Sequence, residues 1–262
     1  MSPKSPTVTV FHGTTAEAAT AIAAQGLLSI SPAVTIRSVA AEYDVEEMDI
    51  HRVLGVLNQF VAVQDDRDKY VWLSATPEKA ASWAQRAPES RWEALRAVWF
   101  LIHRDQSVYE AFDSAWDADR FSPEYRALQA CVFAEFRGEG GLFHTEDFEL
   151  WRFRQYASVE PAVVAIDVPK DQLPNNGSGL IVAGRSVPEV AVTPPLPHEW
   201  VGETIFPGRW VGRRLAIGLL GVSDEEFDTL LRENALPEVH ESFENVFGHW
   251  MWRDLEPLAV HP

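Results

Sequence analysis

Residues alternate between two faces over positions 7–12, which predicts a strand that ends at a polar corner. Val10 and His12 share one face, so the histidine takes the last inward position of this strand. Gly13 permits a close backbone approach, and Thr14 or the threonine after it can cap the next helix. We expect that alanine-rich helix to end at a left-handed Gly26.

Residues 71–75 repeat the alternation, and the sequence Thr-Pro-Glu at 76–78 is typical of a helix start. Trp72 lies on the predicted strand, and Trp83 lies eleven residues later, about two turns into the predicted helix. Both rings can therefore converge on one slot and hold a flat heterocycle such as nicotinamide between them.

The middle of the chain has a predominantly helical pattern. Apolar residues over 53–60 continue a helix, and residues 86–157 are predicted to be a mainly helical insertion. Strand character returns over residues 162–168 and again over 187–193. The prolines at 194, 195 and 197 then end regular structure.

The C-terminal part also has a helical pattern. Residues 209–220 are predicted to form a helix, and Ser223 and Glu226 have the spacing of a capping box. A last helix is expected to begin at Pro237, because apolar residues recur after it at helical spacing. These residues are Phe243, Val246, Phe247 and Trp250. The patterns divide the chain into a domain over residues 1–205 and a helical extension over 206–262 packed on it.

The histidine strand, the Trp72 to Trp83 interval and Glu189 on a late strand resemble the signature of a known family. They are similar to the ADP-ribosyltransferases of the diphtheria-toxin and poly(ADP-ribose) polymerase type. In that family a strand histidine followed by Gly-Thr binds NAD, two tyrosines stand eleven residues apart, and a late strand carries a glutamate. The resemblance implies an α+β fold with a split antiparallel β-sheet around an NAD cleft. It covers residues 7–27, 70–85 and 160–202.

By position, the resemblance implies that His12 hydrogen-bonds the adenosine ribose and that the Gly13 backbone bonds the nicotinamide amide. Trp72 and Trp83 stand where the stacking tyrosines stand, and Glu189 would bond the 2′-hydroxyl of the nicotinamide ribose. The further NAD-binding residues that it implies are Thr14, Ser74 and Arg37. The catalytic candidates are Glu189, His12 and Trp72.

Two features depart from the family pattern, and a third bears on the acceptor. Tryptophan replaces both tyrosines, which keeps the ring faces, removes the phenols and makes this a His-Trp-Glu variant. Ala80 stands where polymerase-type members often have a nicotinamide-binding serine. Val187, two residues before the glutamate, is not the Glu or Gln of members that modify arginine or asparagine. Transfer to arginine is therefore disfavoured.

The proposed chemistry explains why a carboxylate is needed. Cleavage of the bond between nicotinamide and ribose develops positive charge on the sugar, and a nearby carboxylate stabilises that state, as in glycoside hydrolysis. Glu189 could also orient or deprotonate the acceptor nucleophile.

The composition narrows the classes of partner. The chain has 262 residues with 39 acidic against 22 basic side chains, a formal charge of -17, which argues against broad contact with nucleic-acid phosphates. Arg209, Arg213 and Arg214 form the clearest basic cluster, and we expect a solvated helix surface there rather than phosphate contacts. The single cysteine, Cys131, precludes an internal disulfide and is expected to be a buried, inert thiol.

Several other classes lack their motifs. No apolar run approaches the roughly 20 residues that span a bilayer, so no membrane partner is expected. The N-terminus lacks the regions of a signal peptide, which favours cytoplasmic synthesis, although a dedicated secretion system would leave no such mark. No metal is expected, because His240 and His249 lack an obvious third ligand.

The sequence thus favours an NAD-dependent ADP-ribosyltransferase that modifies a macromolecular acceptor, protein or nucleic acid, and releases nicotinamide. Such a compact enzyme most resembles a cytoplasmic toxin, held in check by an antitoxin or immunity protein. One alternative is an RNA 2′-phosphotransferase, which shares the general fold and also uses NAD but would need basic phosphate-binding residues. The other is a catalytically silent module that binds NAD, ADP-ribose or a protein.

Overall fold

The computed structural model describes residues 6–28, 32–60, 71–85, 89–103, 123, 146–173, 189–242 and 245–260. The predictions made for Cys131 and Val187 lie outside these residues. The chain divides into two compact units. The first unit comprises Met1–Ser29, Asp66–Ala87 and Arg154–Pro262, and the second comprises Ile30–Asp65 and Pro88–Phe153.

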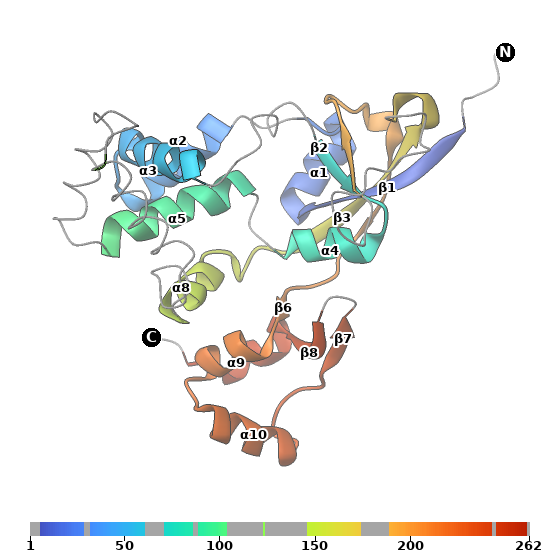
Figure 1. Ribbon diagram of the computed structural model, residues 1–262. Helices are drawn as coiled ribbons and strands as arrows, with labels where there is room; N and C mark the ends of the chain where they lie inside the picture. Colours follow the sequence, from blue (N-terminus) through green and yellow to red (C-terminus); the bar gives the residue numbers. More distant parts are fainter. Residues whose placement is uncertain are drawn as a thin grey trace. The chain divides into compact units, whose positions relative to one another are not determined.

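A five-stranded antiparallel sheet forms the centre of the first unit (Figure 1), with strand order β4-β2-β1-β3-β5. The strands are β1 (Thr7–Thr15), β2 (Val71–Ser74), β3 (Pro161–Pro169), β4 (Glu189–Val192) and β5 (Val201–Ile205). Two 3₁₀ turns, Lys170–Gln172 and His198–Trp200, follow β3 and precede β5. The predicted α+β class and antiparallel sheet are thus confirmed, and β3 lies where the alternation over 162–168 predicts it.

The pairing within this sheet is uneven. β1 and β3 pair along nine positions, from Thr7 opposite Pro169 to Thr15 opposite Pro161. β2 and β4 pair along their whole length, but β1 and β2 share only the pair Phe11 and Ser74. The sheet therefore consists of two well-paired sets of strands that are joined at a single paired position.

Local sequence signals set the helices that follow β1 and β2. Thr15 caps α1 (Ala16–Gln25) through the backbone N–H of Ala18, and Gly26 ends it at a φ of 83°. Thr76 caps α4 (Pro77–Ala84), whose first residue is the proline that the sequence predicts there. Both predicted helix starts and the glycine stop are confirmed.

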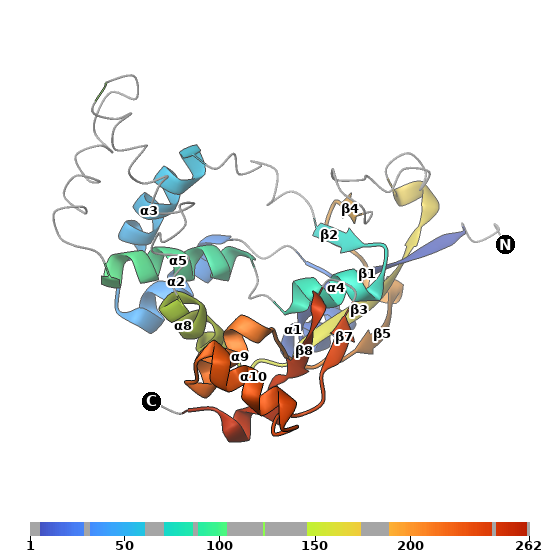
Figure 2. The same cartoon turned by 60° about the horizontal axis from the view of Figure 1, so that its bottom comes forward.

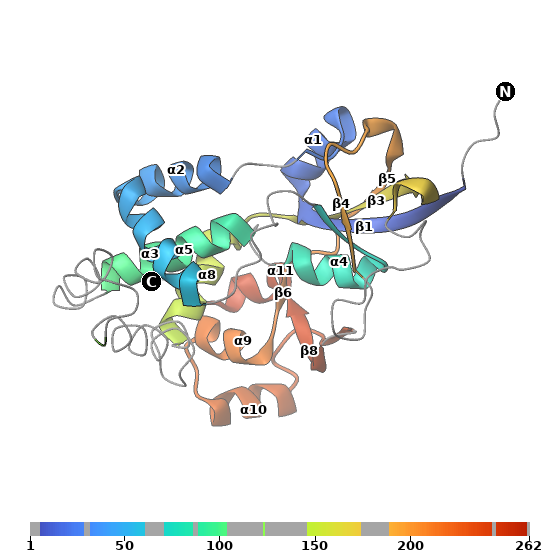
Figure 3. The ribbon, with the colours of Figure 1, turned by 45° about the horizontal axis from the view of Figure 1, so that its top comes forward.

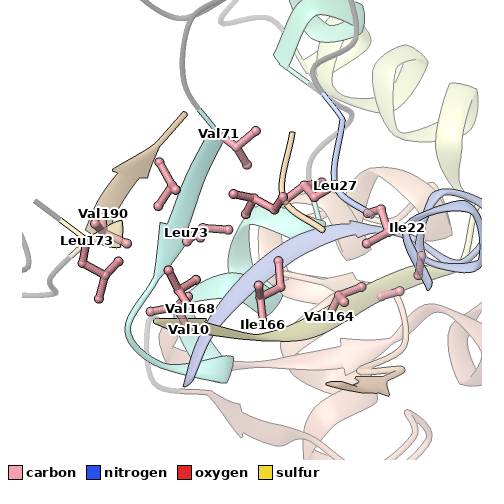
Figure 4. Packing of buried hydrophobic residues seen from close by; sticks show 14 residues of the cluster. Val10, Ile22, Leu27, Val71, Leu73, Val164, Ile166, Val168, Leu173 and Val190 are labelled. Carbon is pink, nitrogen blue, oxygen red and sulfur yellow. The ribbon is translucent and has the colours of Figure 1, made fainter. Parts of the chain in front are cut away.

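One face of the sheet packs against α1. Figure 4 shows the cluster: alternate residues of β1 and β3, such as Val10, Val164 and Ile166, meet Ile22 of α1 and Leu73 of β2. All five side chains are buried. The alternation read from the sequence is therefore the pattern that fills this core.

The opposite face packs against α4. Ala80 and Ala81 of the helix lie on Val163 of β3, with Phe11 of β1 beside them. Gly13 allows the closest approach, because a Cβ added there would lie 2.0 Å from the carbonyl oxygen of Ala80. The strand and the helix thus meet backbone to backbone.

The C-terminal part of the first unit mixes helices with a small antiparallel sheet. The helices are α9 (Arg213–Leu220), α10 (Asp224–Arg232) and α11 (Trp252–Leu255), followed by the 3₁₀ turn Glu256–Leu258. The strands, in sheet order, are β6 (Trp210–Val211), β8 (Asn245–Met251) and β7 (His240–Ser242), of which Figure 2 shows β7 beside β8. Ser223 and Glu226 form the predicted capping box on α10.

The prediction of a helix that begins at Pro237 is wrong. The segment forms the hairpin of β7 and β8, and β8 also pairs with β6 on its other side. Backbone pairing on both sides overrides the apolar spacing, and Trp250 is still buried, against Phe227 of α10.

The second unit is helical in its described part. Its helices, which are labelled in Figure 3, are α2 (Pro32–Tyr43), α3 (Glu47–Phe60), α5 (Glu89–His103) and the start of α8 (Glu146–Tyr156). Their core contains Ile50, Phe100 and Phe148. None of the helices in the described ranges combines the length and the apolar character that crossing a membrane requires.

We predict that Gly13→Ala will destabilise the first unit by at least about 3 kcal/mol, because its Cβ would overlap backbone atoms that cannot turn aside. The nearest are the Ala80 carbonyl oxygen at 2.0 Å and the Ala84 nitrogen at 2.8 Å. The free energy of unfolding in urea measures this cost. Gly202→Ala on β5 is the matched control, since its Cβ would lie 3.5 Å from the nearest atom. Equal stability of the two variants would contradict the close approach.

Candidate functional site

Most of the predicted site residues lie on the face of the sheet that α4 covers. Gly13 is on β1, Trp72 and Ser74 are on β2, Trp83 is on α4 and Glu189 begins β4. Ser74 is buried and pairs with Phe11 on one side and with Glu189 on the other. The single position at which β1 and β2 pair therefore also holds the glutamate in register.

Trp83 and Glu189 are in direct contact. The indole Nε1 of Trp83 donates a hydrogen bond to Oε1 of Glu189 at 2.8 Å. The other carboxylate oxygen, Oε2, accepts no hydrogen bond from the described residues. One oxygen of the carboxylate is thus fixed by the helix, and the other can accept a hydrogen bond from a ligand.

The two tryptophans expose large parts of their rings. Trp72 is 37% exposed and Trp83 is 41% exposed, whereas large aromatic side chains are usually well covered. The ammonium group of Lys79 lies 5.5 Å from the centroid of the Trp83 ring. The exposed Trp83 ring, beside a carboxylate and a cation, suits a flat, polar ligand.

His12 joins β1 to β2 just beyond their single paired position. Its Nδ1 lies 3.3 Å from the main-chain oxygen of Trp72. A carbonyl can only accept, so Nδ1 carries the proton and Nε2 is the acceptor of the neutral ring. Burial lowers the pKa of His12, and the hydrogen bond to Trp72 opposes that shift. The ring is therefore neutral at pH 7.

Alternation along β1 separates His12 from the other candidates. His12 lies opposite Val164, on the face that α1 covers, whereas Gly13 lies on the face that α4 covers. His12 reaches β2 through the Trp72 main chain and not through a side chain of the other face. The short strands β2 and β4 thus connect His12 to the carboxylate of Glu189.

The turn residues of β1 have structural partners. The missing side chain of Gly13 is explained by the α4 backbone that lies against it. Thr14 pairs with Ala162 of β3 and remains partly exposed, while Thr15 provides the helix cap. Ala80, the residue at the family's serine position, is fully buried under the sheet.

Arg37 belongs to a different unit from the other candidates. It lies on α2, in the second unit, and its exposed guanidinium pairs with Glu47 at 3.3 Å. Its assignment to NAD stays a prediction from the resemblance.

The expectation of a solvated basic surface is wrong for Arg209. Its side chain is buried, and its guanidinium donates to the main-chain oxygens of Gln85 and Val159. Burial lowers its pKa to about 10, so it stays charged at neutral pH. Arg213 pairs with Asp224 and Asp228 on α10.

The sequence analysis gives no role near the site to Gln85 or Arg209. The Arg209 guanidinium donates to the main-chain oxygen of Gln85, and the Gln85 side chain bonds the main chain of Gly208 and Trp210, which flank Arg209. These contacts join positions more than a hundred residues apart, and no local pattern marks them. Comparison of the chain with protein-family models, curated proteins and solved structures gave no match. The interpretation of the site therefore depends on the residues and their contacts.

The hydrogen bond between Trp83 and Glu189 should give a coupling of about 1 kcal/mol. Bonds to charged groups contribute about 1.5–3 kcal/mol, and exposure reduces that value. We would measure the coupling from urea unfolding of Trp83→Phe, Glu189→Ala and the double variant. The same cycle with Trp72→Phe is the control, because no hydrogen bond joins its indole to Glu189. A Trp83 coupling as small as the control would refute the bond.

Stability should fall as the pH falls below about 6.5, where histidines in the unfolded chain take up protons. Burial lowers the pKa of His12. Burial and the charge of nearby His240 both lower the pKa of His249. The unfolded state therefore binds more protons in this range, and ΔG of unfolding rises with pH. His12→Asn, which keeps a donor near the Nδ1 position, should show a shallower slope between pH 7 and 5.5. An unchanged slope would contradict the assignment.

Proposed function

We propose that this protein is an NAD-dependent ADP-ribosyltransferase, which transfers ADP-ribose to a macromolecular acceptor and releases nicotinamide. The observation that carries the proposal is the hydrogen bond from Trp83 to Glu189. It joins the two residues to which the family resemblance assigns nicotinamide stacking and ribose binding. They are 106 positions apart in the chain. A fortuitous sequence pattern gives no reason for such a contact.

The groups at this site suit the chemistry of transfer. The ring faces of Trp72 and Trp83 would hold nicotinamide, and the free Oε2 of Glu189 would accept a hydrogen bond from the ribose 2′-hydroxyl. The bond between C1′ and the pyridinium nitrogen breaks, and its electron pair leaves with neutral nicotinamide. The negative charge of Glu189 stabilises the cationic sugar. An acceptor lone pair then bonds C1′, and the acceptor loses a proton, which the Glu189 carboxylate would take up.

His12 would act as a binding residue in this scheme. Its Nδ1 is engaged with the Trp72 carbonyl, so Nε2 is the nitrogen left to accept from a ribose hydroxyl. The same bond ties the position of Trp72 to that of the histidine. A neutral ring is required for this role, which agrees with the direction of its pKa shift.

The acceptor and the biological setting belong to the proposal as well. The formal charge of -17 favours a protein acceptor over one bound through a long phosphate backbone. A toxin with a dedicated antitoxin or immunity protein is the setting that such an enzyme most resembles. Fractionated protein, RNA and DNA pools incubated with labelled NAD would identify the acceptor class.

Purified protein should release nicotinamide from NAD, and Glu189→Gln should reduce the rate about 10²- to 10³-fold. The amide can still accept from Trp83, but the charge that stabilises the sugar is gone. NAD binding, followed by quenching of tryptophan emission, should persist in this variant and weaken in Trp72→Ala. Phe206→Ala is the control, because this 54% exposed side chain follows β5 at the opposite edge of the sheet from β4.

The outcomes separate the proposal from its alternatives. Quenching by NAD without nicotinamide release above the Glu189→Gln level, with or without cell lysate, would identify a silent binding module. Release that requires an RNA carrying a 2′-phosphate would identify the phosphotransferase. No quenching and no release would reject an NAD site altogether.

A further inference from the structure

A pair of residues outside the NAD site holds the end of the helix that carries Trp83. Gln85 caps the C-terminus of α4, two positions after Trp83. Its side-chain Nε2 donates to the oxygen of Gly208 at 2.8 Å, and its Oε1 accepts from the nitrogen of Trp210 at 2.9 Å. One amide thus bonds the main chain on both sides of Arg209.

Arg209 returns the same kind of contact. Its Nη1 donates to the main-chain oxygens of Gln85 at 2.7 Å and Ala84 at 3.4 Å, and its Nη2 donates to that of Val159. The first two oxygens belong to the helix end, where carbonyls lack intrahelical partners. A positive charge is also favourable there, because it opposes the helix dipole.

This pair of contacts, which we call the 85–209 latch, is largely buried around Arg209. The guanidinium lies 4.9 Å from the centroid of the Tyr156 ring, and Arg209 is only 7% exposed. The main-chain oxygen of Arg209 accepts from Trp252 at 2.8 Å, which ties the latch to α11. No carboxylate of the described residues pairs with this guanidinium, so main-chain carbonyl groups bind Nη1 and Nη2 of this buried charge, while Nε has no hydrogen-bond partner among the described residues.

We propose that Gln85 and Arg209 are positioning residues, which fix the end of α4 and thereby hold the Trp83 indole on Glu189. The catalytic importance of this role rests on the proposed function, whereas the contacts of the latch are made by protein groups alone. α4 has only eight residues and cannot hold its own end by helix propensity. The β1 contact at Gly13 fixes its body through Ala80 and Ala84, and the latch fixes the turn that follows.

The latch therefore gives the C-terminal part of the first unit a role in the site. This part begins near Gly208, Arg209 and Trp210, and the pairing of β6 with β8 joins these residues to the small sheet. Loss of the latch should free the last turn of α4. Trp83 would then lose its fixed contact with the carboxylate even though the sheet is intact.

The test is hydrogen exchange of the Trp83 indole proton, assigned by its loss in Trp83→Phe. The Trp83 indole proton should exchange about five- to tenfold faster in Gln85→Ala and in Arg209→Lys. The lysine keeps the positive charge but lacks the planar guanidinium that binds two carbonyl groups at once. The Trp250 indole, which donates to Pro237, should not change in these variants. Gln25→Ala and Arg253→Gln, at exposed positions, are the matched controls and should leave Trp83 unaffected.

The measurement needs no NAD, so its failure is separate from that of the proposed function. Folded Gln85→Ala protein in which Trp83 exchanges at the wild-type rate would overturn the latch proposal. Faster exchange in a protein that neither binds NAD nor releases nicotinamide would support the latch and reject the transferase. If both proposals hold, Gln85→Ala should lower the rate of nicotinamide release at saturating NAD more than it weakens NAD binding.

Discussion

The close approach of β1 to α4 at Gly13 is the contact on which the arrangement of the first unit depends. A side chain at this position would overlap the carbonyl of Ala80, so only glycine lets the strand lie directly on the helix. That distance sets how far α4 stands from the sheet. It therefore also sets whether Trp83 on α4 can reach Glu189 on β4, two strands away from β1. A glycine that the sequence associates with ligand approach thus has a packing role of its own.

The uneven pairing of the sheet complements this contact. β1 is fixed by nine paired positions on β3, whereas its link to β2 is the single pair of Phe11 and Ser74. Beyond that pair the hydrogen bond from His12 to the Trp72 carbonyl takes the place of further ladder bonds. Strands that part from each other leave main-chain groups and side chains open to a ligand, and the exposed Trp72 lies at that point.

The parts of the fold that sequence predicts well are those set by short-range signals. Thr15, Thr76 and the pair of Ser223 and Glu226 cap their own helices, and alternation over 162–168 fills one face of β3. The hairpin of β7 and β8 could not be predicted in this way, because apolar residues at 243, 246, 247 and 250 have helical spacing. Its structure is set by pairing with β6, more than thirty residues earlier. Arg209 was mistaken for a surface residue for the same reason, since the carbonyls that it binds lie far away in sequence.

Tryptophan in place of tyrosine changes which groups the proposed site offers to a ligand and to Glu189. A tyrosine presents its hydroxyl at the tip of the ring, whereas the indole of Trp83 presents an N–H at the ring edge and can only donate. Its bond to Glu189 fixes the carboxylate by a neutral donor, so in the proposed reaction the negative charge would stay available to the cationic sugar. The fixed carboxylate needs little reorganisation when charge develops. Under the proposed function, α4 would therefore take part in the chemistry through the donor geometry of Trp83 and not merely through its ring face.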